Sequence, residues 1–176
     1  KISYNIEKNK LNETVGVQDQ IATSFGGFNS VNINKDGSYQ ISPLNLSTYA
    51  LENFLKRLIL VYTGQTRRAT DIAESKVKNI ASKENEFKIL QDMVSDSKKY
   101  LLNGNIQEFG LLMHEAWKVK RGLSSTVTNK EIDELYQYGV KNGAIGGKIL
   151  GAGGGGFLLF ICKEGEKDNL VKKLNS

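Results

Sequence analysis

The stretch LGAGGGGF, residues 150–157, joins two apolar segments, 146–150 and 157–162, near the end of the chain. Each segment has the length and content of a buried strand, and a glycine-rich connection between two strands predicts a hairpin. A plain turn needs only one or two glycines, whereas this one has Gly151 and the run 153–156. The additional glycines indicate a close approach of the backbone to a ligand or to another segment, and we favour the ligand.

Two nucleotide-binding motifs are excluded at this loop. Gly151, Gly153 and Gly156 match the pattern G-x-G-x-x-G. A dinucleotide fingerprint must open a helix, however, and the following segment 157–162 has the character of a strand. A P-loop requires a lysine followed by serine or threonine, whereas Lys148 is followed by isoleucine. The loop is therefore expected to be a hairpin tip without side chains.

The rest of the chain adds strands and helices around this hairpin. Segments 28–34 and 39–46 flank Asp36-Gly37, which predicts a second hairpin, with Pro43 limiting its second strand to a sheet edge. The apolar run 58–62 is typical of a buried central strand. Helices are expected at 18–25, 47–56, 69–80, 84–102, 106–120, 167–174 and from a cap at Thr128 or Asn129 to residue 142. This order predicts an α+β fold, in which helices pack on an antiparallel sheet.

Composition limits the class of protein. The chain has 176 residues, of which 39% are hydrophobic and 24% charged, with a formal net charge of +5. These values suit a folded domain or one and a half, and no arginine-rich or aromatic–basic pattern favours nucleic acid. The single cysteine, Cys162, and the single histidine, His114, exclude an internal disulfide and a multi-histidine metal site, and we expect both to be structural. No membrane span or signal peptide is visible, so the expected location is cytoplasmic.

A second stretch, residues 16–27, carries one carboxylate, Asp19, at the start of the short expected helix. A carboxylate in a first turn can simply complement the helix dipole, which stabilises by up to about 1 kcal/mol. The flanking glycines and glutamines, Gln18 among them, leave this group open, so it can also accept a proton from a hydroxyl or orient it. Glu7 lies twelve residues earlier. It can lie on a solvated face of the helix. It can also bind Mg²⁺, which takes one or two carboxylates together with phosphate oxygens.

Arg67 and Arg68 form a third candidate. They follow the run 58–62 and the glycine-containing loop 63–66, and fall in the first turn of the helix expected there, whose apolar positions lie between 69 and 80. Positive side chains oppose the helix dipole at this end, whereas an anion is stabilised there. A bound anion, a neighbouring carboxylate or simple solvation of both arginines would each account for them.

Together these stretches resemble the GHMP small-molecule kinases. The segment GVQDQ at 16–20, the segment FGGFN at 25–29 and the glycine motif at 151–157 carry the resemblance, which extends over nearly the whole chain. The first two segments are most similar to the sugar branch, and within it to the kinases of D-glycero-D-manno-heptose 7-phosphate.

The resemblance implies a role for each candidate residue. Asp19 would orient or deprotonate the accepting hydroxyl, with Gln18 binding the substrate, and Glu7 would bind Mg²⁺. The glycine loop would form the floor of the site, with Gly153, Gly154 and Gly155 beside the substrate and Gly151 and Gly156 beside ATP. Our own inference adds that Arg67 and Arg68 hold the phosphate already present on the sugar.

The sequence also departs from the family. The Pro-rich and Gly-Ser-Ser loop that binds ATP and the N-terminal motif are absent, and the chain begins with Lys1. We therefore expect a fragment or processed chain, in which residues 1–27 end the N-terminal kinase domain and 28–176 form a ferredoxin-like C-terminal domain. Such a chain would need the N-terminal half of the same protein as a partner and would be inactive alone.

The resulting hypothesis is ATP- and Mg²⁺-dependent phosphorylation of a sugar phosphate, at the anomeric hydroxyl of heptose 7-phosphate. Fucose, galactose or a mevalonate-like alcohol is an alternative acceptor within the family. A binding module that kept the fold and lost the chemistry is an alternative of another class. Neither nucleic acid nor a membrane is expected as a partner, and a homodimer is left open.

Overall fold

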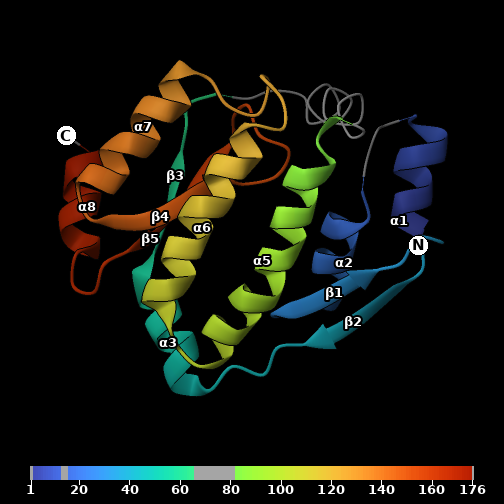
Figure 1. Cartoon of the computed structure of the whole chain (residues 1–176), viewed down its shortest axis with the longest axis horizontal. Helices are drawn as coiled ribbons and strands as arrows, with labels where there is room; N and C mark the ends of the chain where they lie inside the picture. Colours follow the sequence, from blue (N-terminus) through green and yellow to red (C-terminus); the bar gives the residue numbers. More distant parts are fainter. Residues whose placement is uncertain (1, 13–15, 66–81, 176) are drawn as a thin grey trace. The chain divides into compact units, whose positions relative to one another are not determined.

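The computed structural model describes residues 2–12, 16–65 and 82–175. The chain divides into two compact units, Lys1–Leu46 and Ser47–Ser176 (Figure 1). None of the helices in the described ranges is long and apolar enough to cross a membrane.

The first unit contains short helices and one hairpin. Its elements are α1 (Ile2–Asn5), the π-helix η1 (Ile6–Lys10), α2 (Gln18–Phe25), β1 (Asn29–Ile33) and β2 (Tyr39–Pro43). The proposed domain boundary after residue 27 falls between α2 and β1. Compact units and family domains need not coincide, so that boundary stays a prediction.

The hairpin of the first unit is confirmed at Asp36-Gly37. Strands β1 and β2 pair antiparallel, from Ile33 opposite Tyr39 to Asn29 opposite Pro43. Gly37 has φ +79°, and Asp36 Oδ1 accepts hydrogen bonds from the backbone N–H and the hydroxyl of Ser38 at 2.9 and 2.6 Å. A positive φ is the conformation for which glycine is needed in such turns, which explains why the Asp-Gly pair identified the hairpin.

The second unit contains a three-stranded sheet and the long helices. Its elements are α3 (Thr48–Arg57), β3 (Leu58–Tyr62), α5 (Glu84–Leu102), α6 (Ile106–Arg121), α7 (Lys130–Lys141), β4 (Ala144–Ile149), β5 (Phe157–Cys162) and α8 (Lys167–Leu174). The predicted glycine-loop hairpin is confirmed as β4 and β5. The helix expected at 69–80 lies outside the described residues.

The sheet has the strand order β3-β5-β4, with both pairs antiparallel. The prediction that residues 58–62 form a central strand is therefore wrong: within the described chain β3 is an edge and β5 is the centre. Leu60 and Tyr62 on β3 are 55% and 52% exposed. An apolar run cannot distinguish a central strand from an edge strand whose outward face is also apolar, and this caused the error.

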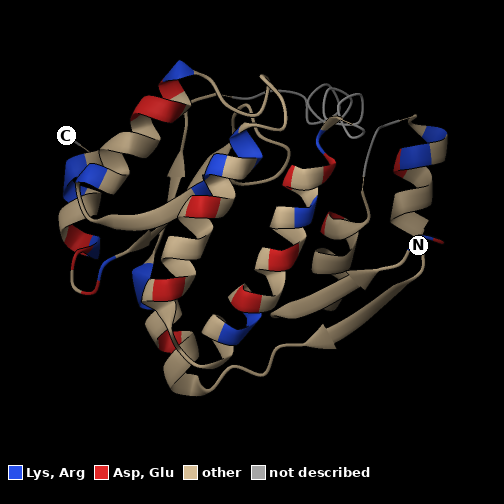
Figure 2. Cartoon of the chain, in the orientation of Figure 1, with Lys and Arg blue, Asp and Glu red and all other residues tan. Residues whose placement is uncertain are grey.

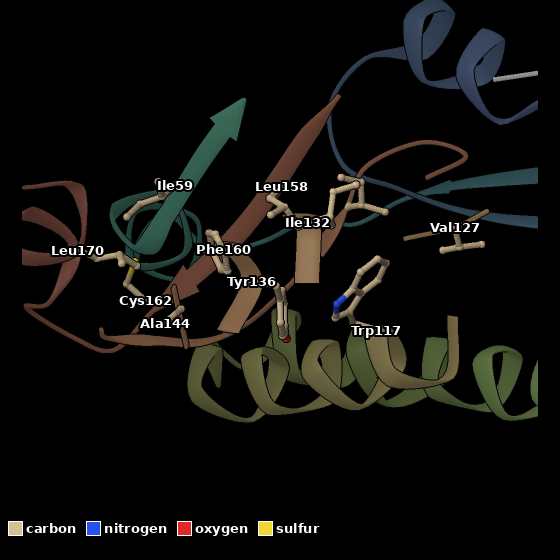
Figure 3. Close-up of a cluster of buried hydrophobic side chains, with 11 residues drawn as sticks. Ile59, Trp117, Val127, Ile132, Tyr136, Ala144, Leu158, Phe160, Cys162 and Leu170 are labelled. Atoms are coloured by element: carbon tan, nitrogen blue, oxygen red, sulfur yellow. The ribbon is translucent and has the colours of Figure 1, made fainter. Parts of the chain in front are cut away.

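The core of the second unit lies between the sheet and the helices (Figure 3). It joins Trp117 of α6 and Tyr136 of α7 to Leu158 and Phe160 of β5, with Leu170 of α8, and all five are at most 3% exposed. Lys, Arg, Asp and Glu gather on the helices, whereas β3 and β5 contain none (Figure 2). The packing of the helices on an antiparallel sheet confirms the predicted α+β class.

Candidate functional site

The glycine loop connects β4 to β5 and begins where the strand pairing ends. The backbone N–H of Leu150 donates to the carbonyl of Phe157 at 2.8 Å, which closes the hairpin. Beyond it, φ is positive at Gly151, Gly153, Gly154 and Gly156. Few residues other than glycine adopt this conformation, so the loop's path depends on its composition.

One side of the loop rests on Val127, in the connection between α6 and α7. The N–H of Gly154 donates to the carbonyl of Val127 at 2.8 Å. A Cβ atom added to Gly153 would lie 2.6 Å from that same oxygen. Side-chain carbons do not approach oxygen so closely, and glycine is therefore required at residue 153 by its own protein neighbour.

The other side of the loop rests on the segment that leaves β3. The N–H of Gly156 donates to the carbonyl of Gln65 at 2.8 Å, and the N–H of Thr63 donates to the carbonyl of Gly156 at 2.9 Å. A Cβ atom on Gly155 would lie 2.7 Å from the Gln65 carbonyl oxygen. Approach to another segment thus accounts for Gly153 and Gly155, whereas no atom of the described residues lies within 4 Å of a Cβ placed on Gly151 or Gly156.

Positive side chains lie beside this loop. Lys120 Nζ, on α6, donates to the carbonyls of Ile149 and Gly151 at 3.2 and 2.9 Å. Lys148 belongs to β4, and burial lowers the pKa of its ammonium group. The loop is exposed at Gly151 and buried from Gly153 to Gly155. The ammonium group of Lys120 lies at its exposed end, where it could also interact with an anionic ligand.

Asp19 lies in the first unit, in the first turn of α2, as predicted. Its side chain is exposed, and no described residue forms a hydrogen bond or ion pair with its carboxylate. Val17 is the N-cap and provides no side-chain cap, while Gln18 is also exposed. The carboxylate thus has free acceptor positions at the positive end of a helix.

Glu7 lies on η1 and contacts Gln20 of α2. Gln20 Nε2 donates to Glu7 Oε2, and the Ser3 hydroxyl donates to Glu7 Oε1 at 3.3 Å. Gln20 Oε1 is buried and has no hydrogen-bond partner among the described residues. Our sequence reasoning missed this link, although Gln20 stands next to Asp19, because only the folded unit brings η1 to α2.

The donor chemistry of Glu7 suits a hard cation, since carboxylate oxygens are the protein ligands that Mg²⁺ takes. No cluster of three or more His, Cys, Asp or Glu side chains occurs among the described residues. A site with one or two carboxylates completed by phosphate oxygens needs no such cluster.

Arg67 and Arg68, the third candidate, lie outside the described residues. The described segment that leads to them ends at Gln65, whose backbone is bonded to the glycine loop. Asn129 Nδ2, at the start of α7, also donates to Gln65 Oε1 at 2.6 Å. The sequence marks Asn129 as a helix cap, which is confirmed, but gives no sign of this contact.

His114 belongs to the packing of the second unit. Its Nδ1 lies 2.6 Å from the hydroxyl of Tyr136, and the two rings stack. Burial lowers the pKa of His114 and raises the pKa of Tyr136 to about 12. These contacts favour the structural role expected for the histidine.

Comparison with known proteins identifies a family. Residues 97–176 match the family model described as GHMP kinases C terminal. The D-glycero-alpha-D-manno-heptose 7-phosphate kinase of Campylobacter jejuni is 33% identical over 99% of this chain and 52% of its own length. The bifunctional fucokinase/GDP-fucose pyrophosphorylase of Arabidopsis thaliana is 31% identical over 86% of this chain and 15% of its own length.

A solved structure supports the same fold. The mevalonate kinase of L. major, in complex with R-mevalonate, superposes with a TM-score of 0.72 at 24% identity, over 89% of this chain and 47% of the kinase. The chain thus spans about half the length of this kinase and of the heptose kinase.

Proposed function

Residues 97–176 form a GHMP kinase C-terminal domain, and on this premise we propose that the protein phosphorylates a sugar phosphate with ATP. The acceptor in this proposal is the anomeric hydroxyl of D-glycero-D-manno-heptose 7-phosphate. The observation that supports it is the 33% identity to a heptose 7-phosphate kinase, which extends along 99% of the chain and so includes both candidate stretches.

Asp19 acts on the accepting hydroxyl in this proposal. The hydroxyl oxygen attacks the γ-phosphorus, the bond to the β,γ-bridging oxygen breaks, and ADP leaves. Asp19 accepts the hydrogen bond of the hydroxyl and takes its proton as the new bond forms. Its exposed carboxylate, with free acceptor positions, suits this role.

Glu7 holds Mg²⁺ in this proposal, and Gln20 keeps the Glu7 side chain in place. The ion, when bound, neutralises charge on the phosphates.

The glycine loop and the arginines provide the remaining contacts. Gly153, Gly154 and Gly155, which are buried against Val127 and Gln65, shape the loop beside the sugar phosphate in this proposal, and Gly151 and Gly156 present backbone to ATP. Gly151 and Gly156 have open space at their Cα atoms, which is compatible with a ligand. Arg67 and Arg68, which follow Gln65 by two and three residues in the sequence, hold the phosphate of the sugar in this proposal.

The partner in this proposal is the N-terminal half of the same protein, which carries the ATP-binding segment in the family. The 176-residue chain alone is expected to bind heptose 7-phosphate and to turn over no ATP. Isothermal titration of this chain with heptose 7-phosphate and with ATP measures the binding of each ligand. Binding of heptose 7-phosphate without any turnover by the full-length protein would favour the binding module that kept the fold and lost the chemistry.

An acceptor panel with the full-length protein tests the proposed reaction. Initial rates are measured with heptose 7-phosphate, heptose without the phosphate, fucose, galactose and mevalonate, each at several concentrations. We expect the highest kcat/KM for heptose 7-phosphate and a large loss when its phosphate is removed. Equal kcat/KM for the two heptoses would contradict the role of the sugar's phosphate.

Fucose is the second candidate acceptor, and the similarity to a bifunctional fucokinase favours it. Fucose carries no phosphate, so a fucose kinase needs no positive side chain to bind a phosphate on its acceptor. A kcat/KM for fucose above that for heptose 7-phosphate would replace the first proposal by this one.

A further inference from the structure

Residues 151–156 of the glycine loop have a single side chain, the methyl group of Ala152. The contacts of the loop to Val127 on one side and to Gln65 on the other are made by backbone atoms, and Lys120 and Thr63 bond to the carbonyls at its two ends. The position of the central glycines therefore depends to a large part on whatever holds Val127 and Gln65. Both are held by side chains at the beginning of α7, which also lies against the sheet through Tyr136.

Asp133 holds the Val127 side. One carboxylate oxygen, Oδ2, accepts a hydrogen bond from Arg121 Nη2 at 2.6 Å, at the end of α6. The other oxygen, Oδ1, accepts one from the hydroxyl of Thr128 at 2.7 Å. Thr128 follows Val127 directly, so one carboxylate fixes both ends of the connection that carries Val127.

The carboxylate of Asp133 is well placed to be rigid. The side chains of Asp133 and Arg121 are 23% and 34% exposed. Charge-assisted hydrogen bonds in partly buried positions are short and well oriented, in contrast to pairs in open solvent. Both oxygens of Asp133 are used, which limits rotation of the carboxylate.

Asn129 joins the two sides of the loop. Its Oδ1 accepts from the N–H of Ile132 at 2.9 Å, as the N-cap of α7, and its Nδ2 donates to Gln65 Oε1 at 2.6 Å. A cap requires only the acceptor oxygen. The amide nitrogen is not needed for capping and ties the Gln65 side to α7.

We propose that Thr128, Asn129 and Asp133 are positioning residues, which set the glycine loop for phosphoryl transfer. The inference rests on the proposed function, because it assumes that the loop lines the reaction site. Backbone donors act on a transition state only when they are placed within a fraction of an ångström, so loosening the supports lowers turnover without removing any group that touches the ligand.

The test compares Thr128→Val with Thr128→Ser in the full-length protein. Valine keeps the shape and removes the hydroxyl, whereas serine keeps the hydroxyl. We expect kcat for the sugar phosphate to fall about tenfold in Thr128→Val and to remain within about twofold of wild type in Thr128→Ser. Hydrogen exchange at the N–H of Gly154 should quicken in the valine variant only.

Glu164→Gln is the matched control. Glu164 pairs with Arg57 at 2.6 Å, the same separation as the pair of Asp133 and Arg121, and it does so away from the loop. This variant should keep wild-type kcat, whatever its effect on thermal stability. A loss of kcat in this control equal to that of Thr128→Val would reduce the effect to lost stability and overturn the inference.

The remaining outcomes also decide. Unchanged kcat in Thr128→Val, with or without faster exchange, overturns the positioning role, and so does a fall in kcat without faster exchange at Gly154. If the wild-type protein phosphorylates no acceptor in the panel, the proposed function fails instead. The exchange rates of the Gly154 N–H in the two variants then still show whether the Thr128 hydroxyl holds the loop. Equal rates in Thr128→Val and Thr128→Ser would show that it does not.

Discussion

The two stretches that carry the kinase resemblance differ in how well packing explains their residues. In the second unit, Gly153 and Gly155 are required by carbonyl oxygens of Val127 and Gln65. In the first unit, Asp19 is exposed and unpaired among the described residues, and Gly16 has open space around it.

This difference changes the weight of each stretch as an indication of function. A residue whose identity is required by its neighbours would be needed in a folded domain of any activity. Where no neighbour requires a particular residue, packing does not explain why that residue is present. Asp19 therefore provides better support for catalysis than Gly153 and Gly155 do, although the glycine run is more conspicuous in the sequence.

The largest expected effect is on Asp19. In the full-length protein, Asp19→Asn should lower kcat by about 10²–10⁴, because the amide cannot take the proton of the accepting hydroxyl. The free energy of unfolding should change by no more than about 1 kcal/mol, the contribution of a carboxylate to the helix dipole. Steady-state kinetics and denaturant unfolding measure the two effects.

Asp168→Asn is the control, since Asp168 is an exposed carboxylate in the first turn of α8. It should repeat the small effect on stability and leave kcat unchanged. Near-normal turnover in Asp19→Asn would return Asp19 to the role of a carboxylate that complements the helix dipole.

The second effect is on the packed glycines. Gly153→Ala should destabilise the protein by about 2–5 kcal/mol, because its Cβ meets the Val127 oxygen and its φ of +114° is unfavourable for alanine. Gly151→Ala has a φ of +63° and open space, so it should cost only the backbone part, about 1–2 kcal/mol. Equal costs in chemical denaturation would show that the Val127 contact does not require glycine.

The sequence predicted those parts of the fold that depend on local rules. The hairpin at Asp36-Gly37 follows from turn chemistry, and the helix cap was expected at Thr128 or Asn129, of which the structure has Asn129. The position of β3 could not be predicted, because strand order depends on which partners the run 58–62 finds. An edge strand with Leu60 exposed has the same residues as a central one.

The site was predicted less completely, for a similar reason. Excess glycine indicates close approach, but residues 127 and 65 are far from the loop in sequence, so the approaching segment could not be identified. The contact between Gln20 and Glu7 was missed because it needs η1 beside α2. Local patterns identified Asp19 and the loop as candidates, and only the fold separates packing from function.

The third effect is a pH dependence that should arise in the second unit. Burial raises the pKa of Tyr136 from 10.0 to about 12 and that of Cys162 from 9.0 to about 11. Each group ionises first in the unfolded chain, so its contribution is full below the unfolded pKa and is lost as pH rises to the folded one. For Tyr136 this is up to about 3 kcal/mol between pH 10 and 12.

Tyr136→Phe should remove the loss of stability that Tyr136 causes between pH 10 and 12. Thermal unfolding at several pH values measures this slope of stability against pH. Tyr138→Phe, at a more exposed tyrosine of the same helix, should leave the slope as it is. The same slope in Tyr136→Phe as in wild type would show that the Tyr136 hydroxyl is not its source.

The smallest effect is expected at Gly16, and it bears most directly on the comparison of the two stretches. Among the described residues, no heavy atom lies within 4 Å of a Cβ placed there, and φ is outside the left-handed region. Gly16→Ala should therefore change the free energy of unfolding by no more than about 0.5 kcal/mol. If kcat/KM for the sugar phosphate falls while stability is unchanged, the glycine is required by a ligand and not by the fold, in contrast to Gly153. If both stay at wild-type values, Gly16 serves neither, and the functional importance of this stretch rests on Asp19 and its neighbouring glutamines.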